Sequence, residues 1–174
     1  MQGYGNRGMA FEELLNIANQ QYKQRGIALI NKRPTPVKVL KSKGTQVLKG
    51  FYETKSTVDY DGIYNGQAIA FEAKSVQGKR FDLKNIHPHQ LNYLENASKH
   101  GATTFFLIEF RDTHQVFFTP LSMIKFYQKQ AEKGGRKSIP LDDFNVYAYE
   151  VQNGRGVILD YLAIVDKLEK AKTL

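Results

Sequence analysis

The Asn65-Gly66 pair is the feature of this sequence that most constrains its fold. Both residues tolerate the positive φ angles of a two-residue hairpin turn, and apolar and aromatic residues flank the pair on either side. We therefore expect a β-hairpin over residues 56–75. A two-residue turn also fixes the register, which would pair Tyr64 with Gln67, Gly62 with Ile69, Tyr60 with Phe71, Asp59 with Glu72, and Thr57 with Lys74.

One face of this predicted hairpin is polar. Because side chains alternate along a strand, the polar face would carry Thr57, Asp59, Glu72 and Lys74. The opposite face would pack against helices and would carry Val58, Tyr60, Ile69 and Phe71. Directly opposed residues have Cβ atoms about 4.5–5.5 Å apart, so Asp59 and Glu72 would repel each other unless they share a proton or a divalent cation.

The polar face has the composition of a site for metal-assisted phosphodiester hydrolysis. Oxygen ligands from Asp, Glu and Thr suit Mg²⁺, which keeps several waters. Lys74 cannot be a ligand beside such an ion, but it could orient a nucleophilic water or stabilise a pentacovalent phosphate. The alternative is a solvated face with cross-strand ion pairs. The small residues Ala68, Ala70 and Ala73 favour a ligand site, although a one-residue bulge would break the register.

A lysine-rich segment over residues 37–51 lacks acidic residues and follows Pro34 and Pro36. Gly44 could mark the tip of a hairpin within it. We expect a projecting basic stalk, inserted at about residues 37–55 and carrying Lys38, Lys41, Lys43 and Lys49. A mobile surface loop is the alternative that the composition leaves open.

The remaining sequence alternates between helical and strand patterns. Helical periodicity and end signals predict helices over residues 9–25, 87–101, 121–133 and 159–172. Apolar runs predict strands over residues 27–33, 102–111, 115–121 and 146–151. The order indicates an α/β fold in which helices flank a mixed sheet, within a single domain of 174 residues.

The charge of the chain favours a polyanionic partner. The formal net charge is +8 and the isoelectric point is about 9.5, which favours nucleic acid ahead of a membrane. The chain has no cysteine, which excludes disulfides and thiolate metal sites and favours a reducing, intracellular setting. No stretch is apolar for long enough to span a bilayer, and the glycine-rich, then acidic N-terminus is not a signal peptide.

The spacing of the polar residues resembles that of the restriction-endonuclease-like nuclease superfamily. Twelve residues separate Asp59 from Glu72, and Glu72-Ala73-Lys74 follows the pattern E-x-K. Longer blocks resemble the RecU family of Holliday-junction resolvases: NRGMAFEE at residues 6–13, KRPTPV at 32–37, STVDYDGIYNG at 56–66, FEAKS at 71–75 and LKNIHPHQ at 83–90.

This resemblance implies a homodimeric nuclease that cuts four-way DNA junctions with Mg²⁺ or Mn²⁺. It implies that Lys74 stabilises the transition state, that Glu12 supports the site and that the stalk enters the junction centre. The metal ligands that it implies are Thr57, Asp59, Glu72 and Gln90. Recombinase proteins are candidate partners, and the expected location is the cytoplasm of a bacterium or of a phage-infected host.

Basic residues outside the hairpin are candidate DNA contacts. Arg7 lies ahead of the first helix, whose N-terminal N–H groups favour anions. A second cluster beside the metal site consists of Lys79, Arg80 and Lys84. Two other functions stay open: a related nickase or restriction-type nuclease, and a non-catalytic protein that binds or remodels junctions. The opposed carboxylates disfavour a pure binding protein, and the basic stalk disfavours a restriction-type enzyme.

Overall fold

A six-stranded mixed sheet forms the centre of the protein. The computed structural model describes the backbone of residues 6–53 and 57–172 and the side chains of residues 9–53 and 57–171. The strand order across the sheet is β1 (Ala28–Lys32), β4 (Tyr60–Tyr64), β5 (Gln67–Val76), β7 (Thr103–Phe110), β8 (Gln115–Pro120) and β10 (Tyr149–Glu150). β5 and β7 are parallel, and the other neighbours are antiparallel.

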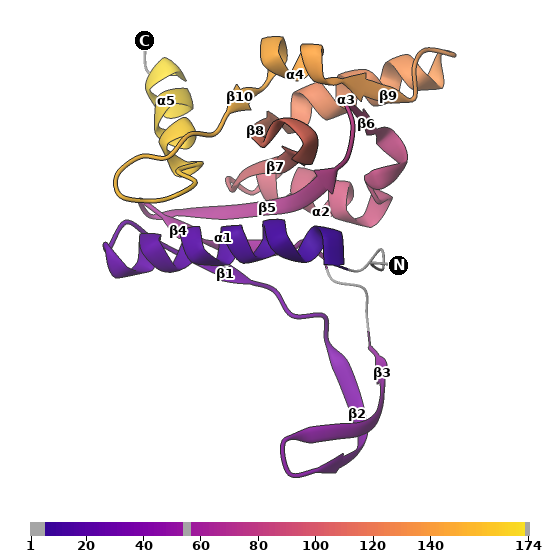
Figure 1. Ribbon diagram of the computed structural model, residues 1–174, viewed down its shortest axis with the longest axis vertical. Coiled ribbons are helices and arrows are strands. Elements are labelled where there is room, and N and C mark those ends of the chain that lie inside the picture. Colours follow the sequence, from indigo (N-terminus) through magenta and orange to yellow (C-terminus); the bar gives the residue numbers. More distant parts are fainter. Residues whose placement is uncertain (1–5, 54–56, 173–174) are drawn as a thin grey trace.

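Helices cover both faces of this sheet and bury two separate apolar cores (Figure 1). One core lies under α1 (Asn6–Gln24) and α5 (Leu162–Lys172). The other lies under α2 (Pro88–Lys99), α3 (Leu121–Glu132) and α4 (Leu141–Tyr147). The predicted α/β fold is thereby confirmed, and it is consistent with a restriction-endonuclease-like architecture. Short elements complete it: β6 (Arg80–Asp82), which pairs with β9 (Ser138–Pro140), and the 3₁₀ helices η1 (Leu83–Asn85) and η2 (Arg111–Thr113).

The hairpin of β4 and β5 has the predicted register. Tyr60 pairs with Phe71, and Asn65 and Gly66 form the turn with φ angles of 48° and 76°. The ladder ends at Tyr60, so the predicted pairs of Asp59 with Glu72 and of Thr57 with Lys74 are not part of it. The placement of Val58 beside Tyr60 is wrong. Val58 is buried in the core under α2, whereas Tyr60 is buried under α1. The alternation of strand side chains fails at Val58 because this residue precedes β4.

The lysine-rich segment forms an isolated two-stranded ribbon, which we call the stalk. β2 (Val37–Lys43) and β3 (Gln46–Tyr52) pair only with each other, and every residue in them is exposed. Gly44 lies at the tip with a φ of 58°. The stalk projects from the body along the longest axis of the molecule (Figure 1). The predicted projecting element is confirmed over these strands, while residues 54–55 lie outside the described part of the chain.

The region after α3 departs from the prediction. The strand expected over residues 146–151 is reduced to β10, because α4 continues through Tyr147. Leu141 and Phe144 of α4 are buried in the core under α2, whereas Val146 and Tyr147 are exposed. Tertiary burial of one helical face therefore overrides the local strand propensity of the β-branched and aromatic residues.

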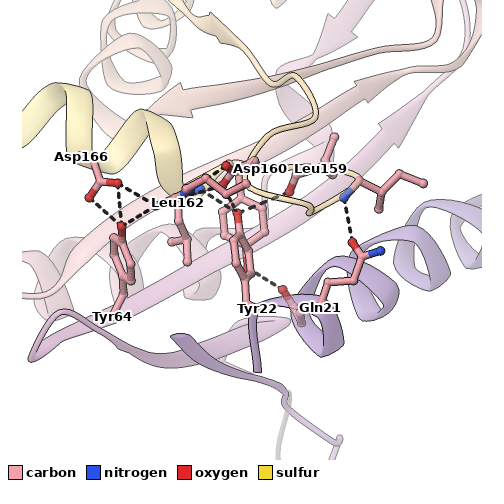
Figure 2. Close-up of polar contacts among 11 residues, drawn as sticks. Gln21, Tyr22, Tyr64, Leu159, Asp160, Leu162 and Asp166 are labelled. Atoms are coloured by element: carbon pink, nitrogen blue, oxygen red, sulfur yellow. Dashed lines mark hydrogen bonds and ion pairs between the residues drawn. The ribbon is translucent and has the colours of Figure 1, made fainter. Parts of the chain in front are cut away.

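A partly buried polar network joins the C-terminal segment to α1 and to the hairpin (Figure 2). The Tyr22 hydroxyl donates to Asp160 at 2.8 Å, and the Tyr64 hydroxyl donates to Asp166 at 2.6 Å. Arg155 forms ion pairs with both carboxylates, at 2.6 and 3.0 Å. These contacts hold the turn end of the hairpin against the C-terminal segment. Asp59 and Glu72 lie toward the other end of the same hairpin. Among the described residues, no helix combines the length and apolar character needed to cross a bilayer.

Candidate active site

Glu72 is the centre of the candidate site and is almost completely buried. It lies in the middle of the sheet, on β5 and directly beside Phe106 of β7, with a side chain 1% exposed. A buried carboxylate is costly unless hydrogen bonds and charges compensate it. The Lys74 ammonium donates to Oε1 at 2.8 Å, the Gln90 amide donates to the same oxygen, and the Asp59 backbone N–H donates to Oε2 at 3.1 Å. Both oxygens of Glu72 are therefore engaged.

Asp59 lies against Glu72 just beyond the end of the ladder, so the predicted contact is present without the predicted ladder pairing. While its backbone N–H binds Glu72, its own Oδ2 accepts a hydrogen bond from the Ala73 backbone N–H at 3.1 Å. These two bonds are reciprocal and hold two carboxylates side by side in a partly buried position. Such an arrangement is unfavourable for two anions in the absence of a cation or a shared proton.

The pKa of Glu72 reflects this environment. Burial, followed by the neighbouring negative charge of Asp59, raises the pKa of this carboxyl to about 7 against the opposing effect of the Lys74 ammonium. Near neutral pH, Glu72 therefore populates both its neutral and its ionised form. A cation placed against the two carboxylates would favour the ionised form.

Lys74 is positioned by two partners of different chemistry. Its ammonium donates to Glu72 at 2.8 Å and to the Gln90 side-chain oxygen at 3.1 Å, and its side chain is only 16% exposed. Gln90 reaches this position because it lies in the first turn of α2, whose Leu91 and Leu94 pack into the core beneath it. The helix thus supplies an amide to a site built on the hairpin. The solvated-face alternative does not describe these residues, because Glu72, Lys74 and Gln90 are largely buried.

The donor atoms present fit a hard divalent cation. Asp59, Glu72, the Gln90 amide and the Thr57 hydroxyl all offer oxygen donor atoms, and such atoms suit Mg²⁺ with several retained waters. Within the described chain, no group of three or more His, Cys, Asp or Glu side chains is placed to hold a metal.

Thr57 is engaged differently from the other predicted ligands. Its hydroxyl accepts a hydrogen bond from the Arg33 guanidinium at 2.8 Å. Arg33 is not among the site residues predicted from the sequence. The signals in the sequence are its place in the KRPTPV block at residues 32–37 and its position directly before Pro34, ahead of the stalk. The tertiary structure alone shows what it contacts.

Glu12 lies on α1, beside the site rather than in it. Its carboxylate pairs with Lys32 at 2.5 Å, and its backbone carbonyl accepts from the Tyr60 hydroxyl at 3.3 Å. Burial, followed by the charges of Glu12 and Asp59, raises the pKa of Tyr60. Both carboxylates therefore act on this one hydroxyl, although no described hydrogen bond or ion pair joins Glu12 to Asp59, Glu72 or Lys74.

The predicted DNA contacts fall into separate regions. The stalk lysines Lys38, Lys41, Lys43 and Lys49 are all exposed on β2 and β3. Lys79, Arg80 and Lys84 are exposed at and beside β6, and Lys84 pairs with Asp82 at 3.3 Å. Arg7 lies within α1, but its side chain is outside the described part of the structure.

Comparison with known proteins identifies the family. The model of the family described as RecU, recombination protein U, matches residues 6–167. The chain belongs to the RecU family. Proteins named Holliday junction resolvase RecU are similar over nearly the whole chain. The one from Geobacillus sp. (strain WCH70) is 36% identical over 171 residues, with 95% of this chain and 85% of the relative covered.

Relatives from other genera agree. The resolvase from Lactococcus lactis subsp. lactis (strain IL1403) is 38% identical over 175 residues, covering 97% of this chain and 81% of its own length. The resolvase from Pediococcus pentosaceus is 35% identical over 171 residues, covering 95% of this chain and 85% of its own length. The matched residues include the hairpin, the stalk and α2, so the candidate site lies within the part of the chain shared with the RecU family.

Proposed function

We propose that this protein is a Mg²⁺-dependent endonuclease that resolves four-way DNA junctions as a homodimer during recombination and repair. The observation that carries the proposal is the buried contact of Asp59, Glu72 and Lys74 in a chain whose relatives are named Holliday junction resolvases. Burying two adjacent carboxylates lowers stability, and a binding surface for DNA has no use for them. A metal-dependent phosphodiesterase requires them.

Asp59 and Glu72, together with Thr57 and Gln90, would hold the cation. When bound, Mg²⁺ would supply a polarised phosphoryl oxygen and an activated water. Lys74 would place its ammonium against the negative charge that develops on the phosphate, because Glu72 and Gln90 already fix the ammonium at the site. Mn²⁺ could replace Mg²⁺, since it accepts the same oxygen ligands.

The stalk would select the branched structure. Four exposed lysines lie on a ribbon that stands away from the body, where they could meet converging phosphates. A four-way junction has an open centre that could admit such a ribbon, and linear duplex has none. Lys79 and Arg80 would contact the backbone of an arm beside the site.

Two exposed apolar regions support a homodimer. The stalk exposes Val39, Leu40, Val47, Leu48, Phe51 and Tyr52. A lone two-stranded ribbon is marginally stable in water, so packing against the stalk of a second copy would stabilise it. Leu29 and Ile63, which pair across β1 and β4 at the edge of the sheet, are about half exposed. Two copies would provide the two active sites that symmetric cleavage needs. The proposed location is the cytoplasm, and recombinase proteins are proposed partners.

One assay tests this function. The purified protein is incubated with a synthetic four-way junction and with linear duplex, each with and without Mg²⁺. We expect paired, symmetric nicks in the junction only, and only with Mg²⁺. Junction binding without nicking in any divalent cation would support a binding protein, and equal cleavage of duplex would support a nickase or restriction-type enzyme.

A further inference from the structure

Arg33 lies where the stalk joins the body. It directly follows β1, and its backbone N–H donates to the Asp59 carbonyl at 2.8 Å, which extends the contact between the β1 and β4 segments. Pro34 begins the segment that leads from Arg33 into β2 of the stalk. On the other side of the stalk, Thr57 is the first residue that the structure describes after Glu53. One residue thus touches both the stalk root and the backbone of a predicted metal ligand.

The guanidinium of Arg33 joins three parts of the protein. Its Nη1 donates to the Thr57 hydroxyl at 2.8 Å and to the Tyr93 hydroxyl of α2 at 3.1 Å. Its Nε pairs with Asp61 of β4 at 3.2 Å, and its central carbon lies 5.7 Å from the centre of the Tyr93 ring. A planar fork with five donors can make these contacts at once, whereas a lysine ammonium could not reproduce their geometry.

This arrangement leaves Thr57 prepared for a cation. A threonine hydroxyl has two acceptor lone pairs, and the Arg33 hydrogen bond occupies one of them. The bond also restricts rotation of the side chain, because Asp61 and Tyr93 hold the guanidinium in place. Partners of this kind orient the ligands of metal sites and typically change metal affinity or activity by 10–100-fold.

We infer that Arg33 is a positioning residue of the metal site, which acts through the Thr57 hydroxyl rather than by contacting DNA. The inference rests on the proposed function, since it takes Thr57 to be a metal ligand. It adds a residue outside the predicted ligand set. This residue lies between β1 and the stalk, and its backbone is hydrogen-bonded to Asp59.

The test compares Mn²⁺ binding to the DNA-free protein by isothermal titration calorimetry in Arg33→Met, Thr57→Val and the double variant. Binding that Asp59→Asn abolishes is taken as the site signal. We expect Arg33→Met to weaken this binding by roughly tenfold. In the Thr57→Val background, Arg33→Met should have almost no further effect, because the hydroxyl through which it acts is gone.

Matched variants separate the role from charge and from folding. Arg136→Met removes the same charge from the exposed turn after α3 and should leave Mn²⁺ affinity unchanged. Tyr93→Phe keeps the ring but removes one hydroxyl partner, so it should weaken Mn²⁺ binding slightly without unfolding the protein. Arg33→Lys should fall between Arg33→Met and the wild type. If Arg33→Met fails to fold, the Mn²⁺ affinities of Tyr93→Phe and Arg33→Lys test the inference in its place, and wild-type affinity in both would contradict it.

Several outcomes would overturn the inference. Unchanged Mn²⁺ affinity in the Arg33 variants would do so. A double variant whose loss of Mn²⁺ affinity equals the product of the two single losses would also do so, because Arg33 would then act independently of the Thr57 hydroxyl. Loss of junction affinity with normal Mn²⁺ binding would make Arg33 a phosphate contact instead. A wild type that binds Mn²⁺ but leaves junctions intact would contradict the proposed function alone. A wild type that binds no Mn²⁺ would contradict both.

Discussion

The site and the stalk both use lysines, in opposite physical settings. Lys74 is mostly buried and bonded to Glu72 and Gln90, whereas every residue of β2 and β3 is exposed. The ammonium of Lys74 is already fixed in the DNA-free protein, so in the proposed reaction it would act on the transition state without reorganising. The stalk ammonium groups stay hydrated and can act only through attraction to phosphate, which salt screens.

This difference indicates a division of labour that mutations can test. Changes in the site should alter catalysis more than DNA affinity, because few atoms there reach solvent. Changes in the stalk should alter DNA affinity and selectivity and leave the fold intact, because the stalk contributes nothing to either core.

Asp59→Asn should have the largest effect. We expect it to abolish junction cleavage in Mg²⁺ while junction binding survives, since the carboxylate would hold the cation and affinity comes mainly from contacts of Lys and Arg with phosphate. Cleavage is measured on a labelled junction, and binding is measured by gel shift without divalent cations. Cleavage near the wild-type rate would remove Asp59 from the site, and equal loss of both properties would indicate misfolding.

Lys74→Ala should lower kcat on the order of 10²–10³-fold, with little change in junction affinity. The reason is that its charge would count mainly in the transition state. Single-turnover cleavage at saturating protein measures this rate directly. Lys43→Ala on the stalk is the matched control and should do the reverse, with slightly weaker binding and normal turnover. A Lys74 variant that binds poorly but turns over normally would place Lys74 among the DNA contacts.

The raised pKa of Glu72 should make the metal-free protein less stable as pH rises. Between pH 4.5 and about 7, the folded protein keeps a proton on Glu72 that the unfolded chain has lost, so the free energy of unfolding falls through this range. The full effect is about 3 kcal/mol. Urea unfolding at several pH values measures this effect. Glu72→Gln should weaken the dependence of the free energy of unfolding on pH. Adding Mg²⁺ to the wild-type protein at pH 7.5 should raise its free energy of unfolding again. The same slope in wild type and Glu72→Gln would contradict the assignment.

Replacement of residues 37–51 by a short Gly/Ser linker should have the smallest effect on the body and a selective effect on binding. We expect a folded protein with unchanged Mn²⁺ affinity, modestly weaker duplex binding and a junction-to-duplex preference reduced by roughly tenfold, about 1.4 kcal/mol. Both affinities are measured at matched salt. Changing Lys38, Lys41, Lys43 and Lys49 to Gln in the intact stalk separates charge from shape. A variant that keeps its full preference would assign selectivity to the spacing of two active sites in a dimer.

The sequence by itself determined the hairpin and the stalk. The register follows from Asn65 and Gly66, because a two-residue turn leaves one pairing for the strands that it joins. The contact of Asp59 with Glu72 then follows from counting residues. The stalk follows from composition, since a run of lysines without acidic partners cannot be buried.

Only the tertiary structure decided how the rest of the site is assembled. Val58 lies in the core under α2 because it precedes β4, where strand alternation does not apply. Part of the predicted strand over residues 146–151 is helical because α4 buries Leu141 and Phe144. Gln90 reaches Glu72 through the packing of α2, and Arg33 reaches Thr57, Asp61 and Tyr93 across three segments. Local sequence encodes turns and periodicity, but contacts between distant segments depend on how whole elements pack, and that information is spread over the chain.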